Sequence, residues 1–391
     1  MDLRDGPERD GVRRRDFVLT AAGVPVAIGR TAFAASDPPN APQGPEPLAA
    51  TLAPHYMTWL HQDSWPFAST WPILRDPEYP LPRGYDSEDP FIYRAHDKAA
   101  VRHGLVWLWS WWGRERGLGG DRTLRSYLDG DPDTPVQLIV LYEATGILAS
   151  SREGFFDFDD PENHRQFVDD MAYLDRSYWS NPRYAHRFFR LDGRPALFTW
   201  NSRNFVGAWS ATVASARQQA PFYLVGSEFA LELGPDGRPV VRSDLAEVAA
   251  PLDAISSYGI YDPRFVPASG RLDDTYAGRY EQALRGWAEI LLTAAPHARL
   301  IPPLQFAFDD HYARPAARHP PLASSGEEAI AVARVARRLV DDARSGDPRY
   351  RNVLPVVFVV SWNEHIEGSA IEWTYERPYG YLAAAISAFR T

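Results

Sequence analysis

The chain of 391 residues contains no cysteine, and several other features that would define a class of protein are also missing. Without cysteine there is neither a disulfide bond nor a thiolate ligand for a metal ion. No apolar run approaches the roughly 18 residues that a membrane-spanning helix requires. The net charge is -10, and arginine and lysine do not cluster beyond the extreme N-terminus. We therefore expect no membrane span and no nucleic-acid partner.

Motifs for cofactors and for other enzyme classes are missing as well. The ten histidines show no H-x-x-x-H or comparable spacing, so we expect no metal site. No G-x-G-x-x-G follows an early apolar run, and no G-x-S-x-G is present. These absences argue against a dinucleotide-binding fold and against a serine hydrolase. We expect a protein that works without a cofactor.

Aromatic residues, by contrast, are abundant. The 13 tryptophans and 19 tyrosines exceed what a core ordinarily needs, because a buried indole or phenol must also satisfy its N–H or O–H. Flat rings in loops suit a sugar-binding cleft, where the C–H faces of pyranose rings stack on them. Large aromatic side chains also serve as plain packing, so this feature favours carbohydrate without establishing it.

The N-terminus resembles a twin-arginine export signal. Arg14 and Arg15 form the pair, Phe17 follows two positions later, and a modestly apolar stretch leads to Ala32-Phe33-Ala34. An A-x-A sequence is typical of a cleavage site, so we expect residues 1–34 to be removed on export. The protein would then be secreted or held at the cell surface. The alternative is a disordered basic arm.

After the signal, residues 35–50 are rich in proline and read as an extended linker. Residues 51–391 show no internal repeat and no second domain. Short apolar runs alternate there with segments of helical spacing. Eight strands are expected, at 55–60, 104–110, 136–142, 196–200, 222–226, 253–258, 299–305 and 354–361. Several are unbroken apolar runs, which suit strands covered on both faces.

The segments between these runs carry apolar residues at helical spacing, most clearly 160–180, 274–293 and 326–343. Strand and helix alternating eight times is the pattern of a single (β/α)₈ TIM barrel. An open doubly wound sheet is the rival, but it usually has fewer strands and a Gly-rich loop. The connection over residues 61–95 contains Trp65 and Trp71, and we expect such aromatic-rich loops to form a cleft wall.

Two acids follow the last expected strand, at Glu364 and Glu367. In a barrel, side chains at the carboxyl ends of strands face the active site. Glycoside hydrolysis needs two carboxyl groups there: one protonates the leaving oxygen and the other acts at or beside the anomeric carbon. Glutamates also cap helices or pair with arginine, so the spacing alone leaves both interpretations open.

The surrounding motif resembles a known family. Residues 361–372, Ser-Trp-Asn-Glu-His-Ile-Glu-Gly-Ser-Ala-Ile-Glu, are similar to the S-x-N-E-x-x-E-G-x-x-I-E segment of glycoside hydrolase family 99. Three other stretches agree in order: 184–197 with its Arg-Leu-Asp-Gly-Arg-Pro-Ala-Leu, 106–113 with its Ser-Trp-Trp-Gly, and 306–315. That family comprises retaining endo-α-mannosidases and endo-α-mannanases on a (β/α)₈ barrel.

The resemblance implies roles for particular residues. Glu367 would be the general acid/base, and Glu364 would deprotonate the substrate 2-hydroxyl, which attacks the anomeric carbon to give a 1,2-anhydro sugar. Tyr56 and Tyr258 would lie at the sugar-binding cleft. The family's H-L-E-P-Y strand end appears here as Leu-Tyr-Glu-Ala-Thr at 141–145, which keeps Glu143 but lacks the His and Tyr.

Further candidate substrate contacts lie at other strand ends. They are Trp59, Trp111, Trp112, Asp309, Asp310, Arg314, Asn363 and His365, the last in place of the family's usual Trp. Alternation along residues 107–112 puts Trp112 on the opposite face from Trp111. We expect a retaining endo-acting α-glycosidase whose partner is a mannan-type polysaccharide or oligosaccharide. The alternatives are an endo-hydrolase of another α-linked bacterial or fungal cell-wall glycan, and a non-catalytic glycan-binding barrel.

Overall fold

A computed structural model describes most of the chain. The described residues are 47–60, 86–117, 119–151, 153–311, 313–314, 316–372 and 380–391. The expected export signal and most of the linker lie outside them, as do Trp65 and Trp71. Both features therefore stay predictions. No helix among the described residues has the length and apolarity to cross a membrane.

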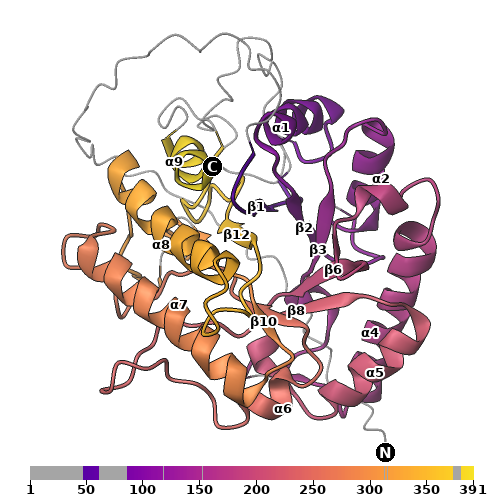
Figure 1. Ribbon diagram of the computed structural model, residues 1–391. Helices are drawn as coiled ribbons and strands as arrows, with labels where there is room; N and C mark the ends of the chain where they lie inside the picture. Colours follow the sequence, from indigo (N-terminus) through magenta and orange to yellow (C-terminus); the bar gives the residue numbers. More distant parts are fainter. Residues whose placement is uncertain are drawn as a thin grey trace, which may run out of the picture. The chain divides into compact units, whose positions relative to one another are not determined.

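The centre of the molecule is a parallel sheet (Figure 1). Its strands are β1 (Thr51–Tyr56), β2 (Trp107–Trp111), β3 (Leu138–Tyr142), β6 (Arg194–Thr199), β8 (Tyr223–Ser227), β9 (Ala254–Ser256), β10 (Arg299–Leu300), β11 (Pro303–Gln305) and β12 (Val356–Val360). They follow the order β10-β9-β8-β6-β3-β2-β1-β12-β11, and every pair along this path is parallel. A short β5 (Arg190–Leu191) adds an antiparallel hairpin to β6, and β4 (Phe156–Asp157) pairs with β7 (Phe205–Val206).

The two ends of this path belong to one strand. β10 pairs with β9 and β11 pairs with β12, and only Ile301 and Pro302 separate β10 from β11. The N–H of Ile301 donates to the carbonyl of Ile255 at 2.9 Å, and the carbonyl of Pro302 accepts from Phe358 at 3.1 Å. Residues 299–305 therefore connect both edges of the sheet and close it into a barrel with eight strand positions.

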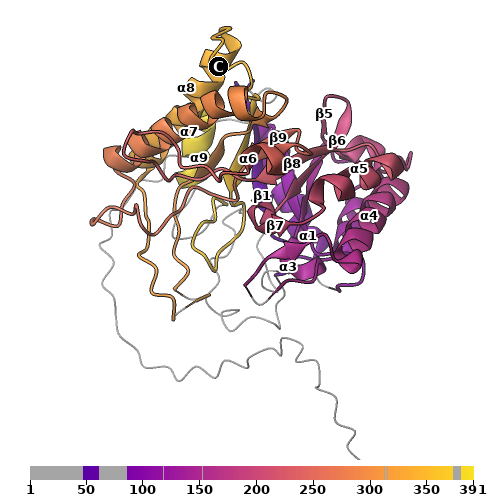
Figure 2. The same cartoon turned by 90° about the horizontal axis from the view of Figure 1, so that it is seen from below.

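A helix follows each strand position in the described part of the chain. These are α1 (Pro90–His103), α2 (Asp121–Gly130), α4 (Pro161–Leu174), α5 (Trp209–Gln219), α6 (Leu245–Ala249), α7 (Asp274–Ala294), α8 (Gly326–Arg344) and α9 (Gly380–Phe389). A short α3 (Ala144–Ile147) precedes α4, and a π-helical turn, Asp175–Trp179, extends it. The helices lie outside the strands (Figure 2).

Local sequence signals define where several helices begin. Asp89 and Asp160 each accept a hydrogen bond from an N–H in the first turn, and each precedes a proline at the first helical position. Proline suits that position because its missing N–H would have no partner in the first turn. At the start of α8, Ser325 and Glu328 form a reciprocal capping box.

The sequence-based fold prediction is confirmed, with adjustments at some boundaries. All eight expected strands overlap an observed strand, and the expected helices match α4, α7 and α8. The first strand runs over Thr51–Tyr56 rather than 55–60. The long connection expected at 61–95 is shorter than that, because its last residues already belong to α1.

Two apolar layers fill the space inside and outside the barrel. The interior layer includes Ala53, Leu108, Leu141, Phe198 and Phe358. The outer layer, between sheet and helices, includes Tyr56, Trp107, Trp109, Trp111 and Tyr142. Because side chains alternate along a strand, the residues two positions after Ala53, Leu108 and Leu141 also face inward. They are His55, Ser110 and Glu143, so the interior becomes polar at the carboxyl ends of the strands.

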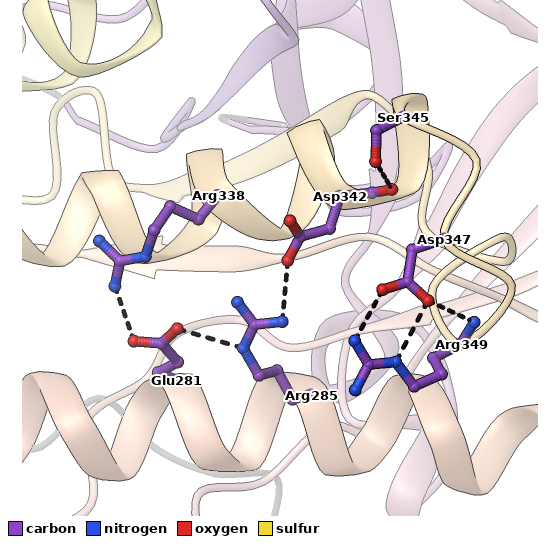
Figure 3. Close-up of polar contacts among 7 residues, drawn as sticks. All are labelled: Glu281, Arg285, Arg338, Asp342, Ser345, Asp347 and Arg349. Carbon is purple, nitrogen blue, oxygen red and sulfur yellow. Dashed lines mark hydrogen bonds and ion pairs between the residues drawn. The ribbon is translucent and has the colours of Figure 1, made fainter.

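The outer surface of α7 and α8 carries a network of ion pairs (Figure 3). The carboxylate of Glu281 accepts from Arg285 at 3.1 Å and from Arg338 at 2.6 Å, and Arg285 also reaches Asp342 at 2.8 Å. The next turn of chain adds a pair between Asp347 and Arg349 at 2.8 Å. These side chains are partly exposed, so each pair contributes little to stability.

Candidate active site

The two acids after β12 lie on a loop that closes on itself. The N–H of Ser361 donates to the carbonyl of Ser369 at 3.1 Å, and the N–H of Ile371 donates back to Ser361 at 2.9 Å. Residues 361–372 therefore leave and return to the same point at the end of β12. We call this segment the catalytic loop, because it carries the two expected catalytic acids, Glu364 and Glu367.

Glu364 is buried, with 2% of its surface exposed. Its Oε1 accepts a hydrogen bond from the N–H of Ile366 at 3.1 Å. The backbone N–H of Glu364 donates to the hydroxyl of Ser361 at 2.8 Å, which fixes the backbone at this position. Burial, followed by the negative charge of Glu367, raises the pKa of Glu364 to about 8. At neutral pH the buried carboxyl therefore holds a proton.

Glu367 is partly exposed and forms an ion pair with Arg314 at 2.6 Å. The same guanidinium reaches Asp310 at 3.0 Å, and His319 approaches Asp310 at 2.8 Å. Burial alone would raise the pKa of Asp310, but the hydrogen bonds from His319 and Arg314 outweigh it and lower that pKa. Asp310 thus anchors the guanidinium of Arg314, which pairs with Glu367 on its other side.

A third carboxyl group, Glu143, follows β3. The hydroxyl of Ser110, at the end of β2, donates to its Oε1 at 2.7 Å. Burial raises the pKa of Glu143 to about 8, and the charge of Glu367 adds to this, while Ser110 and Arg116 lower it. The electrostatic influence of Glu367 places the two carboxyl groups in one neighbourhood.

Tyr258, after β9, completes this group. Burial raises the pKa of its phenol, and the charges of Glu367, Glu364 and Glu143 raise it further. Its ring contacts His55 edge-on, with centroids 4.9 Å apart. His55 is fully buried inside the barrel, which lowers its pKa to about 3, so it stays neutral. Three carboxyl groups and a phenol, from the carboxyl ends of β12, β3 and β9, are therefore close enough to influence one another's charge.

An aromatic pair stands beside Glu143. The indole N–H of Trp112 donates to the hydroxyl of Ser110 at 3.0 Å, and Trp59 contacts the Trp112 ring edge-on at 5.3 Å. The guanidinium of Arg116 lies 4.1 Å from the centre of the same ring. A Cβ atom at Gly146 would come within 2.1 Å of Trp112, so only glycine leaves room for this indole. Trp59 and Trp112 are both partly exposed.

Two of the expected substrate contacts need correction. Tyr56 is 1% exposed and stacks on Trp109 in the layer between sheet and helices. Trp111 is fully buried in the same layer, beside Tyr142. Each side chain points outward from its strand, because it alternates with an inward neighbour, His55 and Ser110 respectively. Neither ring faces the carboxyl groups, so the expectation that they contact a substrate was wrong.

Other expected contacts are already engaged within the protein. The amide of Asn363 forms a pair of hydrogen bonds with the backbone of Met57, at 2.7 and 2.9 Å, and so joins β1 to β12. The ring of His365 bonds to Glu372. Asp309 is exposed, its N–H donates to the carbonyl of Glu367 at 2.7 Å, and its carboxylate accepts from the backbone of His311.

Sequence reasoning missed Ser110, His55 and Glu372. Ser110 lies in a motif that was noticed for its tryptophans, and as the polar residue at the end of an apolar run it was the signal that could have been followed. Among the described residues, no group of three histidine or acidic side chains is arranged to hold a metal ion.

A separate pocket of about 400 Å³ lies after β8, lined by Glu228, Arg242, Asp244 and Trp287 among others. None of the predicted site residues lines it. The hydroxyl of Ser202 donates to the carboxylate of Glu228 at 2.8 Å. The guanidinium of Arg242 donates to both carboxylate oxygens of Asp244, at 2.6 and 2.8 Å. The polar groups of this pocket are hydrogen-bonded to one another. The three carboxyl groups that follow β3 and β12 therefore remain the better candidate for catalysis.

The fold and the position of this group define a (β/α)₈ barrel with a polar site at the carboxyl ends of its strands, the arrangement of many barrel enzymes. A solved structure described as a glycoside hydrolase-like protein is similar, with a TM-score of 0.61 and 16% identity over 92% of this chain and 98% of that chain. Two structures of the GH99 endo-α-mannosidase from Bacteroides thetaiotaomicron, one bound to Bis-Tris-propane, give TM-scores of 0.53 and 0.50. Both are 15% identical over 86% of this chain and 95% of theirs.

The resemblance to family 99 that the motifs indicated is thus confirmed at the level of structure. No family model and no curated protein matches the sequence. At such low identities the similarity shows a shared fold, and the chemistry must be argued from the site itself.

Proposed function

We propose that this protein is a glycoside hydrolase, and more narrowly a retaining endo-acting α-glycosidase. The observation that carries the proposal is the gathering of Glu364, Glu367 and Glu143 at the carboxyl ends of the barrel strands. Their environments differ: burial favours a proton on Glu364, whereas Glu367 is partly exposed and forms an ion pair with Arg314. Two carboxyl groups held in different protonation states are what glycoside hydrolysis uses.

The reaction proceeds in two steps. Glu364 accepts the proton of the sugar 2-hydroxyl, the 2-oxygen bonds to the anomeric carbon, and Glu367 donates its proton to the departing glycosidic oxygen. Water then opens the 1,2-anhydro sugar: Glu367 takes a proton from the water, and Glu364 returns one to the 2-oxygen. The product keeps its anomeric configuration. A 2-hydroxyl trans to the leaving group is required, which an α-mannoside provides.

In the unliganded protein, burial favours a proton on Glu364, the group that this route uses as the base. Glu364 is the protonated group, and Glu367 is paired with Arg314. Turnover therefore needs sugar binding to move the proton to Glu367 and to draw Arg314 aside. Arg314 is suited to this, because half of its side chain is exposed and Asp310 retains it on the other side.

The substrate in this proposal is a mannan-type polysaccharide or glycan. Trp59 and Trp112 offer ring surface next to Glu143, where a pyranose can stack. The family's His and Tyr at the end of β3 are absent, and Ala144 and Thr145 lie near that point in the chain. This difference favours a second candidate of the same class, an endo-hydrolase of another α-linked cell-wall glycan.

A panel of α-mannans and cell-wall polysaccharides, with products read by mass spectrometry, tests the proposal. Oligosaccharide release that disappears in Glu364→Gln and Glu367→Gln would support it. If saccharides bind by calorimetry but no product forms, and binding survives Glu367→Ala, the protein is a glycan-binding barrel instead. NMR of the first product formed distinguishes retention from inversion.

We also propose that the protein is exported by the twin-arginine route and acts outside the cytoplasm. The support is the sequence from Arg14 to Ala34. Replacing Arg14 and Arg15 by lysine should leave an unprocessed precursor inside the cell. Cleavage and export that continue unchanged would contradict the proposal.

A further inference from the structure

The catalytic loop ends at a buried glutamate that the proposed chemistry does not use. Glu372 is 2% exposed, and its Oε2 lies 3.0 Å from Nε2 of His96, which is itself buried on α1. Its Oε1 bonds to Nε2 of His365, in the middle of the catalytic loop. The hydroxyl of Tyr56, on β1, bonds to Nδ1 of His96 at 2.7 Å. We call these four residues the loop clamp.

The direction of each hydrogen bond follows from the charge of Glu372. Burial would raise the pKa of this carboxyl, but the two histidines outweigh burial and lower the pKa to about 2. An ionised carboxylate only accepts hydrogen bonds. Nε2 of His365 therefore donates to Oε1 of Glu372, and Nε2 of His96 faces Oε2 at 3.0 Å. The charge of Glu372 thus holds both imidazoles in one orientation.

The clamp joins three parts of the barrel. Tyr56 ends β1, His96 lies on α1, and Glu372 closes the catalytic loop through a bond from its N–H to the carbonyl of Trp362 at 3.0 Å. His365 stands between Glu364 and Glu367 in the chain, and its side chain is turned to Glu372. The loop is therefore held at its base by the backbone and at its middle by this side chain.

We propose that Glu372 is a positioning residue, which holds the backbone between the two catalytic acids in place through His365 and His96. The inference rests on the proposed glycosidase function for its kinetic consequence, but the clamp itself is a physical claim about the loop. Its importance follows from geometry, because a displacement of about 1 Å in a catalytic group can cost about 100-fold in rate.

Glu372→Gln tests the inference while preserving size. The amide places an N–H₂ where one oxygen stood, so a donor faces the donor of one imidazole and that contact is lost. We expect kcat to fall about 100-fold with KM changed less than threefold, since the acids act in the transition state. Hydrogen exchange of peptides spanning 361–372 should rise. The matched control, Glu281→Gln, removes a carboxylate held by two arginines on α7 and α8, and should change neither quantity.

His365→Gln provides a second route if Glu372→Gln does not fold. The double variant should be little worse than Glu372→Gln alone, because both changes remove the same contact. Aryl glycosides add a readout that general destabilisation would not move. A misplaced general acid slows substrates with poor leaving groups far more than those with good ones.

The outcomes separate the two proposals. Faster exchange in the loop of Glu372→Gln, in a protein whose wild type cleaves no glycan, upholds the clamp and overturns the hydrolase. An active wild type whose Glu372→Gln variant keeps its kcat and its exchange pattern overturns the clamp and upholds the hydrolase. Equal loss for good and poor leaving groups also contradicts the positioning role.

Discussion

The catalytic loop holds two glutamates that are equally buried and oppositely ionised. Glu364 and Glu372 are each 2% exposed, yet the pKa of the first is raised to about 8 and that of the second is lowered to about 2. Glu364 accepts from a backbone N–H and feels the negative charge of Glu367, whereas Glu372 accepts from two imidazoles. Burial removes both from water, and the partners then decide the charge. One end of the loop is set up to exchange a proton and the other to hold the loop in place.

The largest effect should come from removing the catalytic acids. Glu364→Gln and Glu367→Gln should each lower kcat/KM on a cleaved glycan by on the order of 10³-fold, the scale of general acid–base catalysis. Circular dichroism melts at pH 6 should show a thermal midpoint close to wild type. A variant that unfolds without a specific loss of turnover would remove the distinction between Glu364 and Glu372.

Stability at alkaline pH should distinguish the two glutamates next. A carboxyl whose pKa is higher in the folded protein favours folding below its unfolded value, near 4.5, and loses that contribution as pH rises towards 8. Glu364→Gln removes this dependence and should be more stable than wild type at pH 8–9 by a few kcal/mol. Urea unfolding at pH 5 and pH 9 measures the free energy of unfolding of both proteins. The same difference between them at both pH values would contradict the prediction.

Glu372 should show the opposite dependence. Its folded pKa of about 2 lies below the unfolded value, so its contribution is present above pH 4.5 and is lost as pH falls through 2. Glu372→Gln should be less stable than wild type by on the order of 3 kcal/mol at pH 6, and the two proteins should converge near pH 2. A deficit that persists at pH 2 would mean that Glu372 stabilises by packing rather than by charge.

The pH dependence of turnover sharpens the assignment of roles. The proposed route needs an ionised Glu364 and a proton on Glu367, so the active form carries one proton in the pair and kcat/KM should fall about tenfold per pH unit above about pH 8. Initial rates from pH 5 to 9 provide the profile. A rate that keeps rising above pH 8 would mean that turnover needs no proton on the pair, and would contradict the role of Glu367 as the acid.

The smallest effect should come from the aromatic pair. Trp112→Ala removes one stacking surface and should raise KM about tenfold or less while leaving kcat near wild type. Steady-state kinetics on a defined oligosaccharide test this. A large loss of kcat would mean that Trp112 acts through Ser110 on Glu143 rather than on the sugar.

The sequence predicted the barrel well because its strands are continuous apolar runs separated by helical segments. The first strand was placed four residues late, since Tyr56 to Leu60 look more like a strand than Thr51 to Ala53. Glu364 and Glu367 could be anticipated because they follow the last strand, and Glu143 and Tyr258 because of the resemblance to family 99. All of them reach the same end of the barrel.

Contacts between distant segments could not be anticipated. Strands buried on both faces have no polar face to mark the inside, so alternation separated Trp111 from Trp112 without saying which faces inward. Asn363 was expected at the substrate, but its partner is the backbone of Met57, 306 residues away in the chain. The partners of Glu372 lie on α1 and in the middle of the loop, and neither proximity is encoded in local spacing.

The Ser110 hydroxyl donates to Glu143 and accepts from the indole of Trp112, so a single oxygen atom ties a buried acid to an exposed ring. Removing this hydroxyl would take away the hydrogen bond that Glu143 accepts from it and the one that holds the indole of Trp112 in place. Natural or engineered changes in glycan preference on this side of the barrel are therefore expected to retain a hydroxyl at position 110. Adaptation would occur instead at Trp59, which contacts the Trp112 ring edge-on.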